Sequence, residues 1–184
     1  MPAWCDGGMT VALARPSLAH FDSWSDTVAE FGDVHIDGAG LDRGQAADRA
    51  ACEAFIEKAD LYADPQATLP DGHVACDYFW ITDDGQVVGF IAFRRELNDW
   101  LRSYGGHIGY AVRPSRRRQG IARAALDLVL ERARVQGYDR VMLTCDDTNI
   151  GSSRTIEGAG GELEDITDGS EAGIPRLRRY WIAL

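Results

Sequence analysis

Three consecutive arginines followed by a glycine lie in the second half of the sequence, in the segment Arg116-Arg117-Arg118-Gln119-Gly120. The stretch before them, residues 107–112, reads as a strand, and the stretch after Gly120 has the apolar spacing of a helix. The first N–H groups of a helix have no partner within it, and the helix dipole is positive at that end. The turn at residues 117–122 can therefore bind a phosphate, and the arginines would add positive charge around it.

The residues of this turn leave an alternative open, because a tight turn with a solvated arginine cluster has the same pattern. Two other phosphate-binding motifs are excluded: no Gly-Lys-Ser/Thr follows the turn, and the chain has no Gly-x-Gly-x-x-Gly. A nucleic-acid partner is not expected, because the net charge is −10 at pH 7 and binding to a phosphate backbone requires a broad basic face.

The turn matches the Arg/Gln-x-x-Gly-x-Gly/Ala signature of the GNAT superfamily of N-acetyltransferases. Ile108-Gly-Tyr-Ala-Val-Arg-Pro114 resembles the splayed fourth strand of that family and the V-x-P before its pyrophosphate loop. The next helix, the strand to Cys145 and Asn149-Ile-Gly-Ser-Ser153 are similar to the landmarks that follow. The order agrees over about residues 78–161, and several shorter segments resemble a bacterial subgroup of predicted acetyltransferases.

This resemblance implies acetyl-CoA as the cofactor and assigns residues to it. The backbone amides of the signature would bind the pyrophosphate, and the pantetheine arm would pair with the end of the fourth strand like an added strand. Asn149 would contact the pantetheine or acetyl end, although Asn is also a common helix cap. The cofactor-binding residues implied in this way are Tyr110, Val112, Arg117, Arg118, Gln119, Gly120, Ile121, Ala122, Asn149, Ser152 and Ser153.

The sequence departs from the family pattern at the usual general acid. Many members have a tyrosine seven residues after the asparagine, where this chain has Ile156, and Gly161 replaces the usual aromatic residue five positions later. Another group would then protonate the leaving thiolate, or the thiolate would leave unaided. Two alternatives to an enzyme stay open: a non-catalytic sensor of coenzyme A or acetyl-CoA, and an interaction domain that retains only the fold.

Two residues are candidates for proton transfer in such a reaction. His107, near the start of the fourth strand, is the candidate base because its ordinary pKa of about 6.5 suits the deprotonation of an amine. Tyr180, in the last strand, is the candidate acid. Each could instead be a structural residue of the sheet. A backbone N–H of the fourth strand would polarise the thioester carbonyl.

The charge is unevenly distributed, which bears on the acceptor. Residues 1–92 carry 16 acidic and 4 basic residues, a net charge of −12, whereas residues 93–184 carry 13 acidic and 15 basic residues. An acidic first half favours a primary amine on a small cationic molecule as the acceptor. The aromatic residues that could line its pocket are Trp24, Tyr78, Trp80 and Trp100.

The elements that must position these groups follow from periodicity and turn residues. Strands are expected at residues 9–14, 78–81, 87–93, 107–112, 140–145 and 177–184, and helices at 17–31, 45–61, 120–137 and 149–160. The helix after Gly120 should bury Ile121, Ala124, Ala125, Leu128, Val129 and Ala133. The strand–helix–strand unit at 107–145 has the length of a right-handed parallel crossover.

These elements predict an α/β (α+β) fold in one domain, residues 1–184, with a mixed, mostly antiparallel twisted sheet flanked by helices. The resemblance implies splayed central strands and a cofactor-binding core at about residues 78–161. No stretch of about 18 apolar residues and no secretory signal is evident, so no membrane partner and a cytoplasmic location are expected. The four dispersed cysteines predict neither a metal site nor disulfides. The oligomeric state stays open, with a homodimer as one option.

Overall fold

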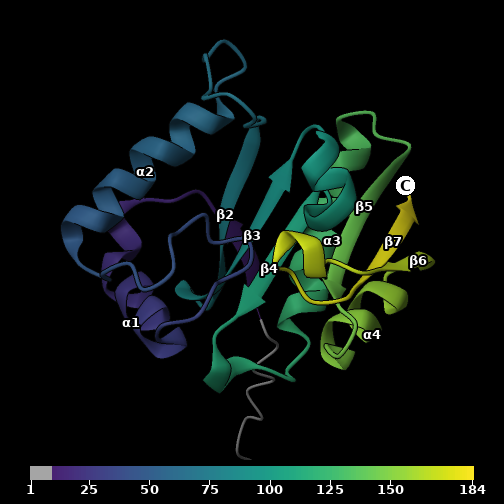
Figure 1. Ribbon diagram of the computed structural model, residues 1–184. Helices are drawn as coiled ribbons and strands as arrows, with labels where there is room; N and C mark the ends of the chain where they lie inside the picture. The colour runs from purple at the N-terminus through teal and green to yellow at the C-terminus, as the bar shows by residue number, and fades with distance from the viewer. Residues whose placement is uncertain (1–9) are drawn as a thin grey trace, which may run out of the picture.

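The computed structural model describes residues 10–184 and places seven strands in one mixed sheet (Figure 1). Their order in the sheet is β1-β2-β3-β4-β5-β7-β6, and every neighbouring pair is antiparallel except β4 and β5. The strands are β1 (Val11–Ala14), β2 (Cys76–Asp83), β3 (Gln86–Arg94), β4 (Ile108–Val112), β5 (Arg140–Asp146), β6 (Gly161–Thr167) and β7 (Leu177–Ala183). The predicted fold class and the parallel crossover are confirmed.

Four α-helices cover the two faces of the sheet (Figure 1). Helices α1 (Phe21–Phe31) and α2 (Arg49–Ala63) pack on one face, where Trp24, Phe55, Trp80 and Phe90 form the core. Helices α3 (Ile121–Val135) and α4 (Ile150–Gly158) pack on the other face against the remaining core residues. Shorter turns lie at Leu18–His20, Leu101–Gly105, Pro114–Arg116 and Ser170–Ala172.

Helix α3 has the predicted amphipathic pattern with two exceptions, because Ala124 is only half-buried and Leu128 is exposed. Ile121, Ala125 and Val129 lie fully buried at helical spacing, and Leu126 and Leu130 are buried beside them. Leu128, which was expected in the buried face, is 40% exposed. The stripe that contacts the sheet is therefore rotated slightly toward Leu126 and Leu130.

Some boundaries differ from those predicted, because local hydrogen bonds decide where each helix begins. The Asp48 side chain accepts the Ala51 N–H at 2.8 Å and caps α2, so this helix begins four residues later than the predicted Gln45. Ser17 caps the short turn at Leu18–His20, and α1 itself begins at Phe21. The predicted first strand at residues 9–14 lies at Val11–Ala14, with Met9 outside the described residues.

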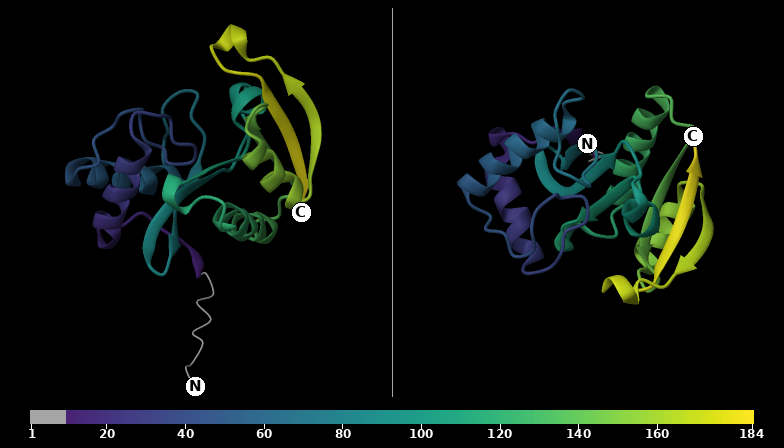
Figure 2. Two further views of the ribbon diagram at one scale, coloured as in Figure 1. Left: turned by 90° about the horizontal axis from the view of Figure 1, so that it is seen from below. Right: turned by 45° about the horizontal axis from the view of Figure 1, so that its top comes forward.

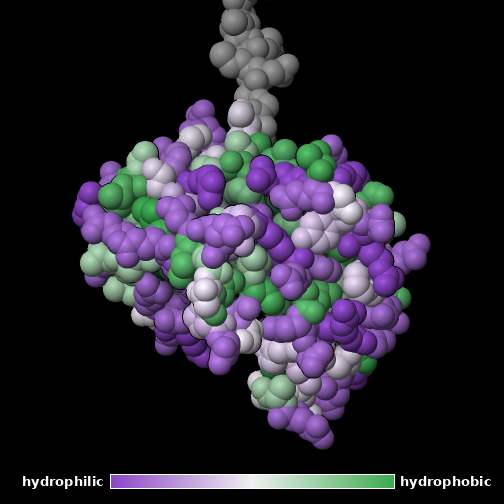
Figure 3. Space-filling view, turned by 90° about the horizontal axis from the view of Figure 1, so that it is seen from above, coloured by the Kyte–Doolittle hydropathy of each residue, from purple (hydrophilic) through white to green (hydrophobic). Residues whose placement is uncertain are grey.

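Strand β6 was not predicted. Its residues 162–166 are all exposed and three of them are acidic, so the sequence Gly-Glu-Leu-Glu-Asp-Ile-Thr lacks a clear apolar alternation. It forms the edge of the sheet, and β7 consequently lies inside the sheet, between β5 and β6. The face seen from above is mostly hydrophilic, with smaller hydrophobic areas between the polar residues (Figure 3). No helix within residues 10–184 combines the length and apolar character needed to cross a membrane.

The loop between α1 and α2, residues 32–48, packs on the centre of the sheet. Gly38 has a backbone φ of +75°, and a Cβ at this position would lie 2.2 Å from the carbonyl oxygen of Gly109 in β4. A glycine is therefore needed at position 38 for the backbone of the loop to contact the backbone of β4, whereas a Cβ on Gly109 would lie 3.3 Å from the Gly38 nitrogen. This contact places the residues beside Gly38 over the fourth strand.

We expect Gly38→Ala to lower the free energy of unfolding by more than Gly32→Ala does. Gly32 has φ +67° and nothing within 4 Å of a new Cβ, so its variant incurs only the left-handed backbone cost of about 1–2 kcal/mol. At Gly38 a steric overlap with Gly109 is added. Chemical denaturation of both variants measures the difference, and equal losses would contradict this packing.

Candidate active site

The turn before α3 leaves a row of backbone N–H groups without protein acceptors. Arg118 and Gly120 have positive φ angles of 64° and 80°, which make the turn tight. Within residues 10–184, no oxygen accepts a hydrogen bond from the amides of residues 118–123, whereas the next amide, that of Ala124, donates to the Gly120 carbonyl at 3.0 Å. Open amides at the positive end of a fifteen-residue helix make a strong anion site.

Two of the three arginine side chains in this turn have partners within the protein. Arg116 pairs with Asp83 at the end of β2, and its Nε donates to Gln119 Oε1 at 3.1 Å. Arg117 Nε donates to the Val112 carbonyl at 3.0 Å, and its guanidinium lies over the Phe31 ring. Arg118 has no ion pair or side-chain hydrogen bond within the described chain. Arg116 and Arg117 therefore also fix the turn, and the positive charge of the three arginines around a bound anion stays a prediction.

Strand β4 separates from β5 shortly after it begins, as the view from below shows (Figure 2). The two strands share one register pair, Ile108 with Leu143, whereas β4 pairs with β3 along its whole length. From Gly109 to Val112, the edge of β4 that faces β5 has no strand partner. An edge of this kind offers N–H and C=O groups to an extended ligand. Tyr110 and Val112 lie on it, where they were predicted.

His107 lies at the closed end of this opening. Its backbone N–H donates to the Met142 carbonyl at 2.7 Å, and its Nδ1 accepts the Met142 N–H at 2.9 Å. The ring is 7% exposed and lies among Phe93, Tyr138 and Trp181. Burial lowers the pKa of His107 to about 4, helped by the charges of Arg102 and Arg94. The structure does not support His107 as a base, because the lone pair of its Nδ1 joins β4 to β5.

Tyr180 is also enclosed by the sheet. The side chain is fully buried in β7, and its hydroxyl donates to Glu157 Oε1 at 2.9 Å. Burial raises the pKa of this phenol. Because the Tyr180 hydroxyl already donates its hydrogen bond to Glu157, the structure gives no support to Tyr180 as the acid that protonates the leaving thiolate.

The start of α4 contributes polar groups on the far side of the opening. Asn149 caps the helix, with its side-chain oxygen accepting the Ser152 N–H at 3.1 Å, as the structural reading of this residue predicted. The Ser152 hydroxyl lies 3.0 Å from the Tyr110 hydroxyl, so this pair bridges β4 and α4. Ser153 is buried and donates to the Ile150 carbonyl at 3.1 Å, which turns its hydroxyl toward its own helix.

The two departures from the family pattern contact each other. Ile156 is fully buried, and a Cβ on Gly161 would lie 2.5 Å from its Cγ2 atom and 2.8 Å from its carbonyl oxygen. An aromatic side chain at position 161 would overlap with this backbone. The two departures are therefore linked, because Ile156 packs in the space that a side chain at position 161 would occupy.

Three ionisable residues gather where the α1–α2 loop crosses β4. His35 Nε2 lies 3.4 Å from Asp37 Oδ1, and this contact raises the pKa of His35. Burial raises the pKa of Asp146 at the end of β5, and the negative charge of Asp37 raises it further. The charge of Asp37 therefore acts on Asp146, so the two carboxylates lie close enough to repel each other. Sequence reasoning assigned no role to these residues, and the acidity of residues 1–92 was a signal only for Asp37.

The aromatic residues suggested as pocket walls mostly lie elsewhere. Trp24 and Trp80 are fully buried beneath α1 and α2. Trp100 is 55% exposed and contacts the ring of Tyr104, whose carbonyl accepts a hydrogen bond from Thr144 of β5. Since side chains alternate along a strand, Thr144 and Asp146 share one face of β5. Tyr78 is half-buried against Phe55 and Tyr62 and lines a separate cavity, so none of the four is shown to line the opening.

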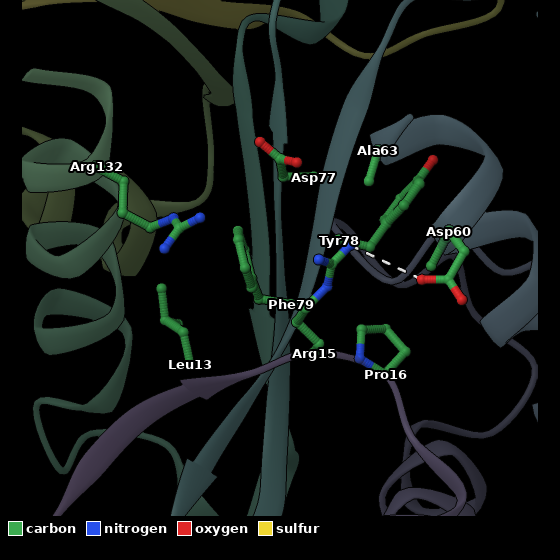
Figure 4. A pocket seen from close by; sticks show the side chains of 10 residues that line it. Leu13, Arg15, Pro16, Asp60, Ala63, Asp77, Tyr78, Phe79 and Arg132 are labelled. Carbon is green, nitrogen blue, oxygen red and sulfur yellow. Dashed lines mark ion pairs between the residues drawn. The ribbon is translucent and has the colours of Figure 1, made fainter. Parts of the chain in front are cut away.

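A cavity of about 150 Å³ lies apart from the opening, between β1, β2, α2 and α3 (Figure 4). Its charged groups mostly have partners: Asp77 pairs with Arg95, and Arg15 lies 3.8 Å from Asp60. Arg132 lies over the ring of Phe79.

No group of three or more metal-ligating side chains occurs in residues 10–184. Cys52, Cys76 and Cys145 are free thiols, and Cys5 lies outside this range. The opening beside β4 is therefore the better candidate site.

Comparison with known proteins gives the family and the shared fold. The family model for the acetyltransferase (GNAT) family matches residues 45–160. No curated protein matches the chain.

Solved structures share the fold at low sequence identity. One is the microcin C7 self-immunity acetyltransferase MccE in complex with acetyl-CoA and AMP, with a TM-score of 0.69, 16% identity and coverage of 95% of this chain and 92% of that one. Another, from Salmonella typhimurium, modifies the N-terminal serine of ribosomal protein L7/L12, with a TM-score of 0.67, 16% identity and 97% coverage of both chains. A third is Mycobacterium smegmatis RimJ in complex with CoA-disulfide, with a TM-score of 0.69, 22% identity and coverage of 94% and 81%.

The position of His107 predicts a pH effect on stability rather than on catalysis. Because its folded pKa of about 4 lies below the ordinary value, its contribution is present above about pH 6.5 and is lost as the pH falls toward 4. His107→Gln keeps an acceptor for the Met142 N–H but does not titrate. We expect its unfolding free energy to fall less steeply than that of the wild type between pH 6.5 and 4. Parallel slopes in denaturant titrations would contradict this assignment.

Proposed function

Because the chain belongs to the GNAT family of acetyltransferases, enzymes that use acetyl-CoA, we propose that it acetylates a primary amine on a small cationic molecule. The observation that carries this proposal is the opening between β4 and β5. Open amides lead into it from the start of α3, and the repelling carboxylates Asp37 and Asp146 lie at its border. A cation between two such carboxylates would relieve their repulsion.

The residues present suit the cofactor. We assign its pyrophosphate to the backbone amides of residues 117–122, since those of residues 118–122 are open within the described chain. The open edge of β4 at Tyr110 and Val112 would pair with the pantetheine arm. Asn149 and Ser152 would border its thiol end. When bound, acetyl-CoA supplies an activated acetyl group as a thioester.

The chain itself must orient the amine and accept its proton. An ammonium group near Asp37 and Asp146 would be stabilised by both carboxylates. His35, whose imidazole contacts Asp37, is the group we assign to accept the proton, in place of the buried His107. A backbone N–H on the open edge of β4 would donate to the carbonyl oxygen under attack. Tyr110, whose pKa burial raises to about 12, stays protonated at neutral pH beside Ser152.

We expect Gly120→Glu to abolish binding of coenzyme A, since it places a bulky anion where the pyrophosphate would lie. Gly137→Glu is the matched control, because Gly137 also has a positive φ and follows the opposite end of α3. Isothermal titration calorimetry compares the two variants. Unchanged affinity in Gly120→Glu would exclude the turn as the phosphate site.

For the acceptor, we expect a panel of amines assayed by free-thiol release to favour small polycationic amines over neutral amines and over peptide N-termini. Asp37→Asn and Asp146→Asn should each raise KM for the best cationic amine roughly twofold to fivefold, as expected for a solvent-exposed ion pair. Asp42→Asn, an exposed carboxylate of the same loop, is the control. A peptide N-terminus as the best acceptor would overturn the proposed substrate class.

A further inference from the structure

A stripe of polar side chains on α1 faces the sheet. Ser23, Thr27 and Glu30 follow each other at helical spacing on one face of this helix. The Ser23 hydroxyl accepts the Val87 N–H at 3.1 Å, and the Thr27 hydroxyl donates to the Val87 carbonyl at 2.7 Å. Ser23 and Thr27 are both buried, so they attach α1 firmly to the start of β3.

Glu30 continues this stripe to the segment that precedes the open amides. Its carboxylate accepts hydrogen bonds from the Ser115 N–H and from the Ser115 hydroxyl, the latter at 3.0 Å. It also pairs with Arg113, whose Nε and Nη2 lie 2.7 Å and 2.6 Å from Oε2. Arg113 reaches back to the Thr27 hydroxyl at 3.3 Å. One carboxylate thus joins α1 to both residues that flank Pro114.

The position of Glu30 is electrostatically unfavourable without these partners. It lies in the last turn of α1, where the helix dipole is negative and opposes a carboxylate. The pKa of Glu30 nevertheless lies below its ordinary value, chiefly because of the Ser115 N–H and then because of Arg113 and the Ser115 hydroxyl. The side chains of Glu30 and Arg113 are only 24% and 21% exposed. The bonds to residues 113 and 115 therefore outweigh the desolvation that opposes the charge of Glu30.

We propose that Glu30 is a positioning residue that fixes the anion-binding turn against α1, so that affinity for the cofactor depends on how α1 packs on the sheet. This inference rests on the proposed placement of the cofactor pyrophosphate at residues 117–122. Phe31, the next residue of α1, contacts the Arg117 guanidinium and adds a second attachment. The α1–α2 loop begins directly after these residues and carries His35 and Asp37. Cofactor and acceptor sites would therefore be coupled through the end of α1.

The test measures coenzyme A affinity, KM and kcat for Glu30→Ala beside Glu53→Ala, which removes a glutamate from an exposed pair with Arg49 on α2. We expect Glu30→Ala to raise the dissociation constant of coenzyme A and KM for acetyl-CoA roughly tenfold, with kcat unchanged. Faster hydrogen exchange of amides 115–123 should accompany this change. Glu53→Ala should leave all these quantities unchanged.

Glu30→Gln and Gly120→Glu distinguish a failure of the Glu30 role from a failure of the cofactor placement. Glu30→Gln keeps the side-chain length but loses the charge, so it carries the test if Glu30→Ala does not fold, with the same direction expected. Wild-type affinity and exchange in the folded Glu30 variants would overturn the positioning role. If Gly120→Glu abolishes binding in the same series, the turn still holds the pyrophosphate and only the role of Glu30 fails. If Gly120→Glu also binds normally, the placement of the cofactor fails as well.

Discussion

The separation of β4 from β5 is the constraint on which the rest of the site depends. A strand in the middle of a sheet normally satisfies its backbone groups on both edges, and β4 does so only toward β3. At the closed end, His107 replaces further strand pairing by bonding Met142 through both its backbone and its ring. Beyond that point the edge of β4 has no strand partner within residues 10–184, and only the Val112 carbonyl at its end accepts a hydrogen bond there, from Arg117 of the turn before α3.

Two sets of interactions keep this opening in shape, one on each face of the sheet. On one face, the Tyr110 hydroxyl bridges to Ser152 of α4. On the other face, Gly38 packs its backbone on Gly109 and brings the acidic α1–α2 loop over β4. Part of the negative charge of residues 1–92 thus lies in the α1–α2 loop, over β4. Open amides form the side suited to an anionic cofactor, and carboxylates lie on the side suited to a cationic acceptor.

The sequence predicted the elements whose signals are local. The antiparallel pair β2–β3, whose strands are joined at Asp84-Gly85, the crossover through α3 and the tight turn before α3 all follow from turn residues and apolar spacing. Strand β6 could not be predicted, because an exposed edge strand with acidic residues has no buried alternation. The roles of His107 and Arg116 were also inaccessible, since each depends on a partner distant in sequence, Met142 and Asp83. Only the fold brings those partners within hydrogen-bonding distance.

The central claim is that backbone amides at the start of α3, rather than arginine side chains, bind the cofactor pyrophosphate. Amide hydrogen exchange with saturating coenzyme A, compared with saturating pantetheine that lacks the pyrophosphate, tests it most directly. We expect coenzyme A to slow exchange of amides 118–123 and pantetheine to leave it unchanged. Equal exchange of these amides in the free and coenzyme A-bound protein would contradict it.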